Sequence, residues 1–204
     1  GTDEVVHARA VDDVLADRDL DASDDVCSTL ARNAYDDDFR AACETLGVDP
    51  AAFFSAREER SATRSVERLA AGTRRLCPDV DALDELVDRA PVGLVSNNYD
   101  PTVSFVVDHF RLDAFAFARG RDLGPEGFRR RKPDPHYLND ALDALDAASG
   151  LYVGDRATDV IAAERAGLDA VFLRRDHNAD VDLAVEPAAE IASLRDLPPL
   201  INAP

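Results

Sequence analysis

A hydroxyl and two amide side chains follow a short apolar run in this sequence, at Ser96, Asn97 and Asn98 after residues 92–95. In an open parallel sheet, ligands gather where strands end, so these residues are candidates for binding. Their side chains and the main-chain N–H groups beside them could bind one anion. Serine and asparagine are also ordinary helix caps, which leaves a purely structural role open.

A pair of carboxylates follows the apolar run 151–153. Asp155 and Asp159 are four positions apart, and therefore lie on the same side of the helix that follows. Two carboxylates at one point repel each other unless a cation relieves the repulsion, and hard oxygen ligands with open water positions suit Mg²⁺. Alternatively, Asp155 caps the helix and Asp159 interacts favourably with its dipole.

Lys132 is the single lysine among 23 lysines and arginines. It precedes Pro133 and Pro135, which fix an extended backbone and limit where the side chain can point. A compact ammonium kept in an otherwise arginine-based chain indicates a position that needs lysine. The alternative is a solvated basic loop, since residues 129–131 are all arginine.

The first part of the chain is helical in pattern. Apolar side chains in residues 4–89 recur at spacings of three and four, without strand-like alternation, and predict about four helices. One of these helices should begin at Asp49-Pro50, and Asp79 should cap another that begins near Val80. We therefore expect a helical domain at 1–89.

After Pro91 short apolar runs alternate with helical stretches, which is typical of a parallel sheet with crossover helices. The fold class is α/β, with a core domain at 90–204. The expected strands are 92–95, 114–118, 151–153 and 170–173, and the expected helices are 100–110, 135–145 and one that Gly167 ends. A loop at 124–131 leads to Lys132, and residues 191–200 should pack on the sheet.

The composition excludes some partners. With 41 acidic and 23 basic residues, the formal net charge of -18 opposes binding to nucleic acid and to anionic membranes. Such an acidic surface is typical of a halophilic protein, whereas a GC-rich genome would explain the scarcity of lysine alone. The three cysteines have no metal-ligand spacing, and no apolar run is long enough to span a bilayer. We expect a soluble, cytoplasmic protein.

Together these groups resemble the haloacid dehalogenase (HAD) superfamily. Its second, third and fourth motifs look like Ser96-Asn97, Lys132-Pro133 and Gly154-Asp155-x-x-x-Asp159, and the resemblance covers about residues 4–175. The resemblance implies a Rossmann-like parallel sheet with helices on both faces and an inserted all-helical cap.

The same resemblance implies a role for each residue. Ser96 and Asn97 would hold the transferring phosphate, and Lys132 would offset the charge on the phosphate and the nucleophile. Asp155 would bind Mg²⁺, while Asp159 would orient Lys132 or a metal-bound water. These roles favour a phosphatase of a small phosphorylated metabolite over the dehalogenase branch, which needs no Mg²⁺.

The superfamily's first motif, Asp-x-Asp-Gly-Thr at the end of the first strand, is absent from this chain. That motif supplies the nucleophilic aspartate, so the resemblance implies a missing central strand and a missing nucleophile. We expect an upstream segment of about 10 to 20 residues to restore both, given the usual length of a strand and its flanks.

The sequence therefore leaves three functions open. The first is a Mg²⁺-dependent phosphatase that acts through an aspartyl-phosphate, the second an inactive relative that binds a phosphorylated ligand or a partner, and the third a 2-haloacid dehalogenase. Four arginines with helical spacing could face an anionic substrate or form a solvated face paired with glutamates: Arg57, Arg60, Arg64 and Arg68. The substrate and the oligomeric state stay open.

Overall fold

A computed structural model describes residues 4–201 and divides the chain into two compact units that alternate along the sequence. The first unit takes the described part of Gly1–Arg74 with Ser96–His109 and Gly120–Arg129. The second takes Arg75–Val95, Phe110–Arg119 and the described part of Arg130–Pro204. Compact units and family domains are different divisions of a chain, so the boundary between 1–89 and 90–204 stays a prediction.

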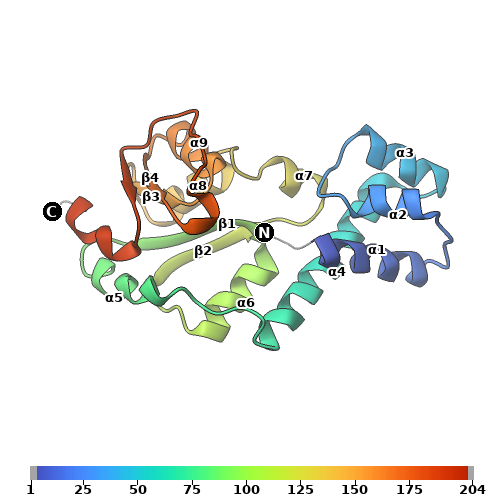
Figure 1. The fold of residues 1–204 in the computed structure, drawn as a ribbon, viewed down its shortest axis with the longest axis horizontal. Coiled ribbons are helices and arrows are strands. Elements are labelled where there is room, and N and C mark those ends of the chain that lie inside the picture. The colour runs from blue at the N-terminus through green and yellow to red at the C-terminus, as the bar shows by residue number, and fades with distance from the viewer. Residues whose placement is uncertain (1–3, 202–204) are drawn as a thin grey trace. The chain divides into compact units, whose positions relative to one another are not determined.

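Four helices at the start of the chain pack around one apolar core (Figure 1). They are α1 (Glu4–Asp17), α2 (Asp24–Ala31), α3 (Asp37–Thr45) and α4 (Pro50–Ala70). The predicted start at Asp49-Pro50 is confirmed. The Asp49 carboxylate accepts a hydrogen bond from the N–H of Ala52 at 2.7 Å, and proline suits the first turn because it has no N–H to leave unpaired.

The core of these helices is aromatic. Phe39, Phe53 and Phe54 have no exposed surface, and the rings of Phe39 and Phe54 meet edge to face with centroids 5.3 Å apart. Phe128, in the short helix α7 (Gly124–Arg129), meets Phe54 in the same way at 5.3 Å. Burial of each ring contributes roughly 1.5 to 3 kcal/mol to stability.

A buried ion pair joins α4 to the strand β2 (Phe115–Arg121). Arg121 donates to Oε2 of Glu58 at 3.0 Å, and the N–H of Gly124 donates to the same oxygen at 2.7 Å. Gly124 has a φ of 87°, a left-handed conformation that favours glycine. The prediction of a loop at 124–131 was wrong for α7, because glycine and proline here lie at the start of a helix instead of breaking one.

The strands of the described residues form two sheets. The first contains β1 (Val92–Tyr99) and β2, and the second contains β3 (Leu151–Gly154), β4 (Asp169–Leu173) and β5 (Ala189–Ile191) in parallel. The predicted parallel arrangement with a crossover helix is confirmed for β3 and β4, which α9 (Ala157–Arg165) connects. Within residues 4–201, β1 and β3 each have one strand neighbour. A missing central strand stays a prediction.

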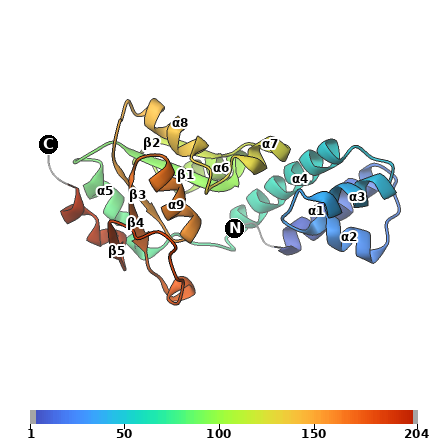
Figure 2. The same cartoon turned by 90° about the horizontal axis from the view of Figure 1, so that it is seen from above.

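Helices cover both faces of the second sheet, as expected for the α/β class. Val171 of β4 packs in a cluster with α5 (Ala82–Leu86), whereas Phe172 packs in another with α9. Successive strand residues point to opposite faces, and α5 and α9 lie on either side of β3 and β4 in Figure 2. Ile191 and Leu197 join the α5 cluster, so the predicted packing of the tail on the sheet is confirmed.

Two further helices fall where the sequence predicts them. They are α6 (Asp100–Phe110) and α8 (His136–Ala144). The φ of 73° at Gly167, just beyond α9, agrees with the predicted helix end. Among residues 4–201, no helix is both long enough and apolar enough to cross a bilayer.

Asp79 does not cap a helix, which corrects the prediction. Residues 78–81 form a 3-10 turn, and α5 begins only at Ala82. The Asp79 side chain is 5% exposed, pairs with Arg175 at 2.5 Å and accepts a hydrogen bond from the N–H of Leu194 at 2.8 Å. Its partners come from the distant C-terminal part of the chain, which a local capping pattern cannot reveal.

Candidate active site

The ammonium group of Lys132 makes polar contacts with several residues of the second unit. Its Nζ lies 2.8 Å from Oδ1 of Asp159, 2.5 Å from the hydroxyl of Tyr152 and 3.2 Å from the carbonyl oxygen of Val95. The residue is 8% exposed. Burial alone would lower the pKa of Lys132, but Tyr152 and the Asp159 carboxylate outweigh burial and raise that pKa, so the ammonium is charged at neutral pH.

Asp159 serves two partners in the first turn of α9. Its Oδ1 pairs with Lys132, and its Oδ2 accepts a hydrogen bond from the N–H of Arg156 at 3.0 Å. Gly154 makes room for this side chain, because a Cβ at that position would lie 2.2 Å from the Cβ of Asp159. The first turn of α9, entered through Gly154, therefore holds the Asp159 carboxylate against Lys132.

Asp155 is held by the loop after β4. Its carboxylate accepts from Nε2 of His177 at 2.9 Å, and its carbonyl oxygen accepts from Nδ2 of Asn178 at 2.7 Å. Asn178 is 4% exposed and also donates to the carbonyl oxygen of Leu173, the last residue of β4. Asn178 thus ties the ends of β3 and β4 to each other, and the Asp155 side chain remains 43% exposed.

Sequence reasoning missed His177, Asn178 and Tyr152. The rule that found Asp155, to inspect the residues after each strand, would also have reached His177 and Asn178 beyond β4. Tyr152 gave no such signal, because a tyrosine inside an apolar strand is typical of a core residue.

The donor chemistry here fits a hard cation in part. Mg²⁺ usually takes one or two carboxylates and keeps several waters, and the partly exposed carboxylate of Asp155 suits that role. Asp159 is already engaged by Lys132 and Arg156. Within the described part of the chain, no group of three or more histidine, cysteine, aspartate or glutamate side chains could hold a metal. A complete ligand set therefore needs groups other than these, such as a substrate phosphate.

Ser96, Asn97 and Asn98 lie inside β1 and belong to the first unit. The Ser96 hydroxyl accepts a hydrogen bond from the N–H of Asn98 at 3.1 Å, and Oδ1 of Asn98 accepts from the N–H of Tyr99 at 2.9 Å. These local bonds form a polar end to the strand. Val95, which directly precedes Ser96 in the chain, is the residue whose carbonyl oxygen Lys132 contacts.

Three of the four spaced arginines, Arg57, Arg60 and Arg64, do not form a solvated face paired with the neighbouring glutamates. Arg57 has no exposed surface and donates to the carbonyl oxygens of Leu30 and Arg32, both at 2.8 Å. Arg60 and Arg64 pair instead with Asp17 and Asp13 of α1. Arg57 also lies 4.0 Å from Glu58, but both side chains are buried. The prediction of a solvated face paired with glutamates was therefore wrong for these three arginines.

Residues 55–167, more than half of the chain, match the family of haloacid dehalogenase-like hydrolases. The chain belongs to this family, as the resemblance of its motifs suggested. The match includes Ser96, Lys132, Asp155 and Asp159.

The chain is also similar to a named phosphatase and to solved structures. The chain is 28% identical over 202 residues to a phosphoglycolate phosphatase of Yersinia pseudotuberculosis, covering 97% of this chain and 86% of that protein. Among solved structures it is similar to CbbY from Rhodobacter sphaeroides in complex with xylulose-1,5-bisphosphate, with a TM-score of 0.56, 16% identity and coverage of 96% and 90%. A dehalogenase solved as an intermediate complex gives a TM-score of 0.56, with 20% identity and coverage of 96% and 91%. Both structures support the α/β fold.

Proposed function

We propose that this protein is a Mg²⁺-dependent phosphatase of a small phosphorylated metabolite. The observation that carries the proposal is the buried pair of Lys132 and Asp159, 2.8 Å apart, next to the partly exposed carboxylate of Asp155 in a hydrolase of this family. A fixed ammonium and a hard-oxygen ligand are the groups that phosphoryl transfer needs to offset charge on the phosphate. The name of the Yersinia relative makes phosphoglycolate the first substrate to test.

In this proposal each residue acts on the phosphate or on another residue. Ser96, Asn97 and Asn98 bind phosphate oxygens through hydroxyl, amide and main-chain N–H groups. Lys132 offsets charge, and Asp159 orients it. Asp155, together with Asp159, would hold Mg²⁺, which when bound supplies positive charge against the developing negative charge of the phosphate.

The nucleophile is proposed to come from outside the 204 residues, in an Asp-x-Asp-Gly-Thr segment that ends a further strand. Such an aspartate would attack phosphorus, displace the alcohol and form an aspartyl-phosphate that water then hydrolyses. The support is that the sequence lacks the motif and that, within residues 4–201, β1 and β3 each pair on one side. A strand edge left open in this way is a site where another strand can add.

The test compares this chain with a chain extended upstream by such a segment. Hydrolysis of p-nitrophenyl phosphate and phosphoglycolate is measured in high salt, with and without Mg²⁺. The proposal expects Mg²⁺-dependent hydrolysis from the extended chain and none from the shorter one. Extended chains carrying Asp155→Asn or Lys132→Met should be inactive, whereas Glu59→Ala, an exposed change on α4, should keep activity.

A second function is favoured by one observation, the absence of the nucleophile motif from the sequence. An inactive relative would bind a phosphorylated ligand without hydrolysing it. Calorimetric binding of phosphoglycolate by an extended chain that shows no hydrolysis would support this function, and chloride release from a 2-haloacid without metal would support a dehalogenase. We also propose a cytoplasmic location and adaptation to high salt for this protein, and both proposals rest on its composition.

A further inference from the structure

Tyr152 combines an apolar ring with a polar end at the candidate site. It is the second residue of β3, and its ring packs against the buried cluster that contains Tyr137, Leu138 and Ala141 of α8. Its hydroxyl lies 2.5 Å from Nζ of Lys132. The ring is therefore anchored by apolar packing, while the oxygen meets the one lysine of the chain.

The hydroxyl of Tyr152 has two hydrogen-bonding tasks. It accepts from Lys132, and it donates to the carbonyl oxygen of Val95 at 3.1 Å. Donation to Val95 requires the protonated phenol, which is the form present at neutral pH. Burial raises the pKa of Tyr152 further and preserves that form, although the charge of Lys132 opposes the shift.

The groups around the ammonium of Lys132, which has three N–H donors, include three acceptors of the described residues. They are Oδ1 of Asp159 at 2.8 Å, the hydroxyl of Tyr152 at 2.5 Å and the carbonyl oxygen of Val95 at 3.2 Å. The Val95 contact is the longest, and Tyr152 already donates to that same oxygen. A phosphate oxygen could therefore replace Val95 as a partner of Lys132 without leaving the carbonyl group unpaired.

We propose that Tyr152 is a positioning residue that fixes the ammonium of Lys132 beside the carbonyl oxygen of Val95 in β1. The long, flexible side chain of lysine does not fix its own charge in space, and a short hydrogen bond to an anchored phenol does. The catalytic consequence of this positioning rests on the proposed phosphatase function. The position of the lysine itself does not, and can be tested in the chain as it stands.

The single lysine makes a direct test feasible. In a chain labelled with ¹⁵N-lysine, Nζ protons give a resonance only when hydrogen bonds protect them from exchange with water, and every such signal belongs to Lys132. We expect one signal from the unaltered chain, with nuclear Overhauser contacts to the ring protons of Tyr152. Tyr152→Phe should shift the signal or remove it by faster exchange. Tyr137→Phe, the same change at a tyrosine of the same cluster that is 1% exposed, should preserve it.

Activity supplies the second measurement. In the extended chain, Tyr152→Phe should lower kcat roughly tenfold with little change in KM, the size expected for loss of one hydrogen bond to a charged group. An unchanged Lys132 signal in Tyr152→Phe would overturn the proposal at any level of activity. If the extended chain hydrolyses nothing, the phosphatase function fails, but the NMR comparison still decides the role of Tyr152. Should Tyr152→Phe not fold, the Overhauser contacts in the unaltered chain decide, and their absence overturns the proposal.

Discussion

Lys132 and Asp159 form an ion pair almost removed from solvent, with side chains 9% and 6% exposed. A pair in such a place costs desolvation energy, which its mutual attraction and its hydrogen bonds offset. Removing one partner leaves the other as a buried, unpaired charge, which strongly lowers the stability of the fold. The pair should therefore behave as a unit in its effect on stability.

Lys132→Met should lower the free energy of unfolding by about 3 kcal/mol, because Asp159 then lacks its counter-ion. Adding Asp159→Asn should recover part of that loss, since the second charge is then absent too. Urea unfolding of both single variants and the double variant measures the coupling. Arg129→Met removes an exposed pair with Glu126 and should be nearly neutral. Simple additivity of the two single changes would contradict the view of the pair as a unit.

Asp79 should make stability depend on pH in the acid range. Burial alone would raise the pKa of Asp79, but Arg175 and the N–H of Leu194 outweigh burial and hold it at about 2. The folded carboxyl group therefore binds its proton at lower pH than the unfolded one, whose ordinary pKa is 3.8. Its contribution of about 2 kcal/mol is present above pH 3.8 and is lost as pH falls towards 2.

The measurement is urea unfolding of the natural chain and Asp79→Asn between neutral pH and pH 2. At neutral pH the natural chain should have the larger free energy of unfolding by the full contribution of Asp79. This difference should shrink as the pH falls below about 4. Asp84→Asn, at an exposed position of α5, is the control and should unfold like the natural chain at neutral pH. A stability difference at Asp79 that does not change with pH would contradict the assignment.

Single residues were predictable where their chemistry follows the end of a strand. Asp155 and Asp159 were found by this rule, whereas Lys132 was found because it is the single lysine of the chain. Lys132 and Asp159 lie in contact, and the role of Asp159 in orienting Lys132 stays a prediction. Tyr152 was missed because its polar contact depends on tertiary packing. The partner of Asp79 was missed because 96 positions separate it from Arg175.

At the scale of elements, α4 is held by a buried carboxylate. Glu58 has no exposed surface and meets Arg121 at the end of β2 and the N–H of Gly124 at the start of α7. The helix α4, the last residue of β2 and the start of α7 thus share one anchoring residue. Arg121 is itself only 4% exposed, so Glu58 is the counter-ion of a guanidinium almost removed from solvent.

Glu58→Ala should lower the free energy of unfolding by about 3 to 5 kcal/mol, since it leaves Arg121 buried without its carboxylate. Glu59→Ala is the matched control: it makes the same change one position along α4, at an exposed site, and should cost less than about 0.5 kcal/mol. Thermal unfolding of both variants measures the difference. Equal effects at the two positions would show that the pair does not anchor α4.

Helices and strands could be predicted where local signals determine them. The predictions failed where tertiary contacts determine the local structure. The start of α4 was visible because a capping aspartate and a proline act within one turn. The short α7 was not, because glycine and proline favour a loop by local preference, while Phe128 packing on Phe54 and the bond from Gly124 to Glu58 favour the helix. Similarly, β1 extends through Ser96, Asn97 and Asn98, which were expected to leave the strand.

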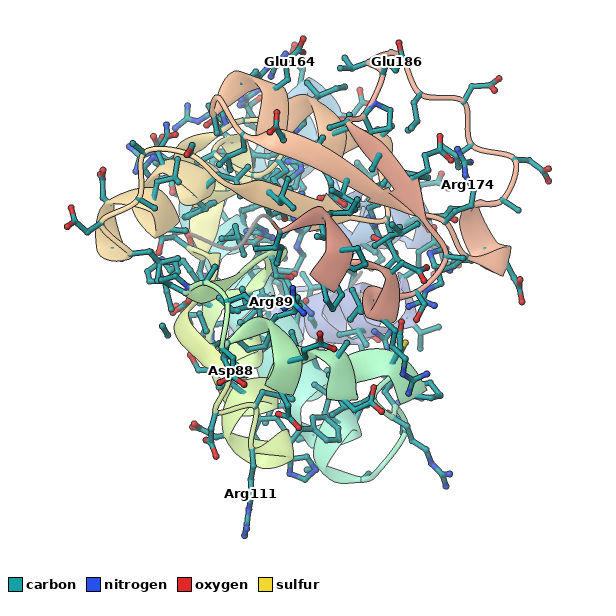
Figure 3. The ribbon with its side chains drawn as sticks, turned by 90° about the vertical axis from the view of Figure 1, so that its left-hand side faces the viewer. Asp88, Arg89, Arg111, Glu164, Arg174 and Glu186 are labelled. Carbon is teal, nitrogen blue, oxygen red and sulfur yellow. The ribbon has the colours of Figure 1, made fainter. Side chains whose placement is uncertain are left out.

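Charge is the main property of the whole molecule. The formal net charge is -18, and Figure 3 shows charged side chains such as Asp88, Arg111 and Glu186 directed outwards. Glu164, Asp169 and Glu186 line one surface hollow of the second unit, where their like charges repel one another. Salt screens such repulsion, reducing its range from about 10 Å at 0.1 M to about 3 Å at 1 M.

The melting temperature should therefore rise when KCl increases from about 0.1 M to about 1 M, because screening favours the compact, self-repelling state. A variant with Glu164→Gln, Asp169→Asn and Glu186→Gln should be more stable at low salt and gain less from added salt. Differential scanning calorimetry across the salt series measures both effects. A melting temperature independent of salt would mean that the acidic excess is not an adaptation to high salt.

The interleaving of the two units has a consequence for protein synthesis. The four N-terminal helices leave the ribosome first, but Arg121, the partner of Glu58, follows 63 residues later. Until it arrives, the Glu58 carboxylate lacks both hydrogen bonds from the Arg121 guanidinium. No single cut of the polypeptide releases either unit whole, since each draws on three stretches separated by the other. Nascent chains arrested before residue 121 should therefore hold α4 loosely and be cut there by proteases, and chains arrested after α7 has emerged should resist.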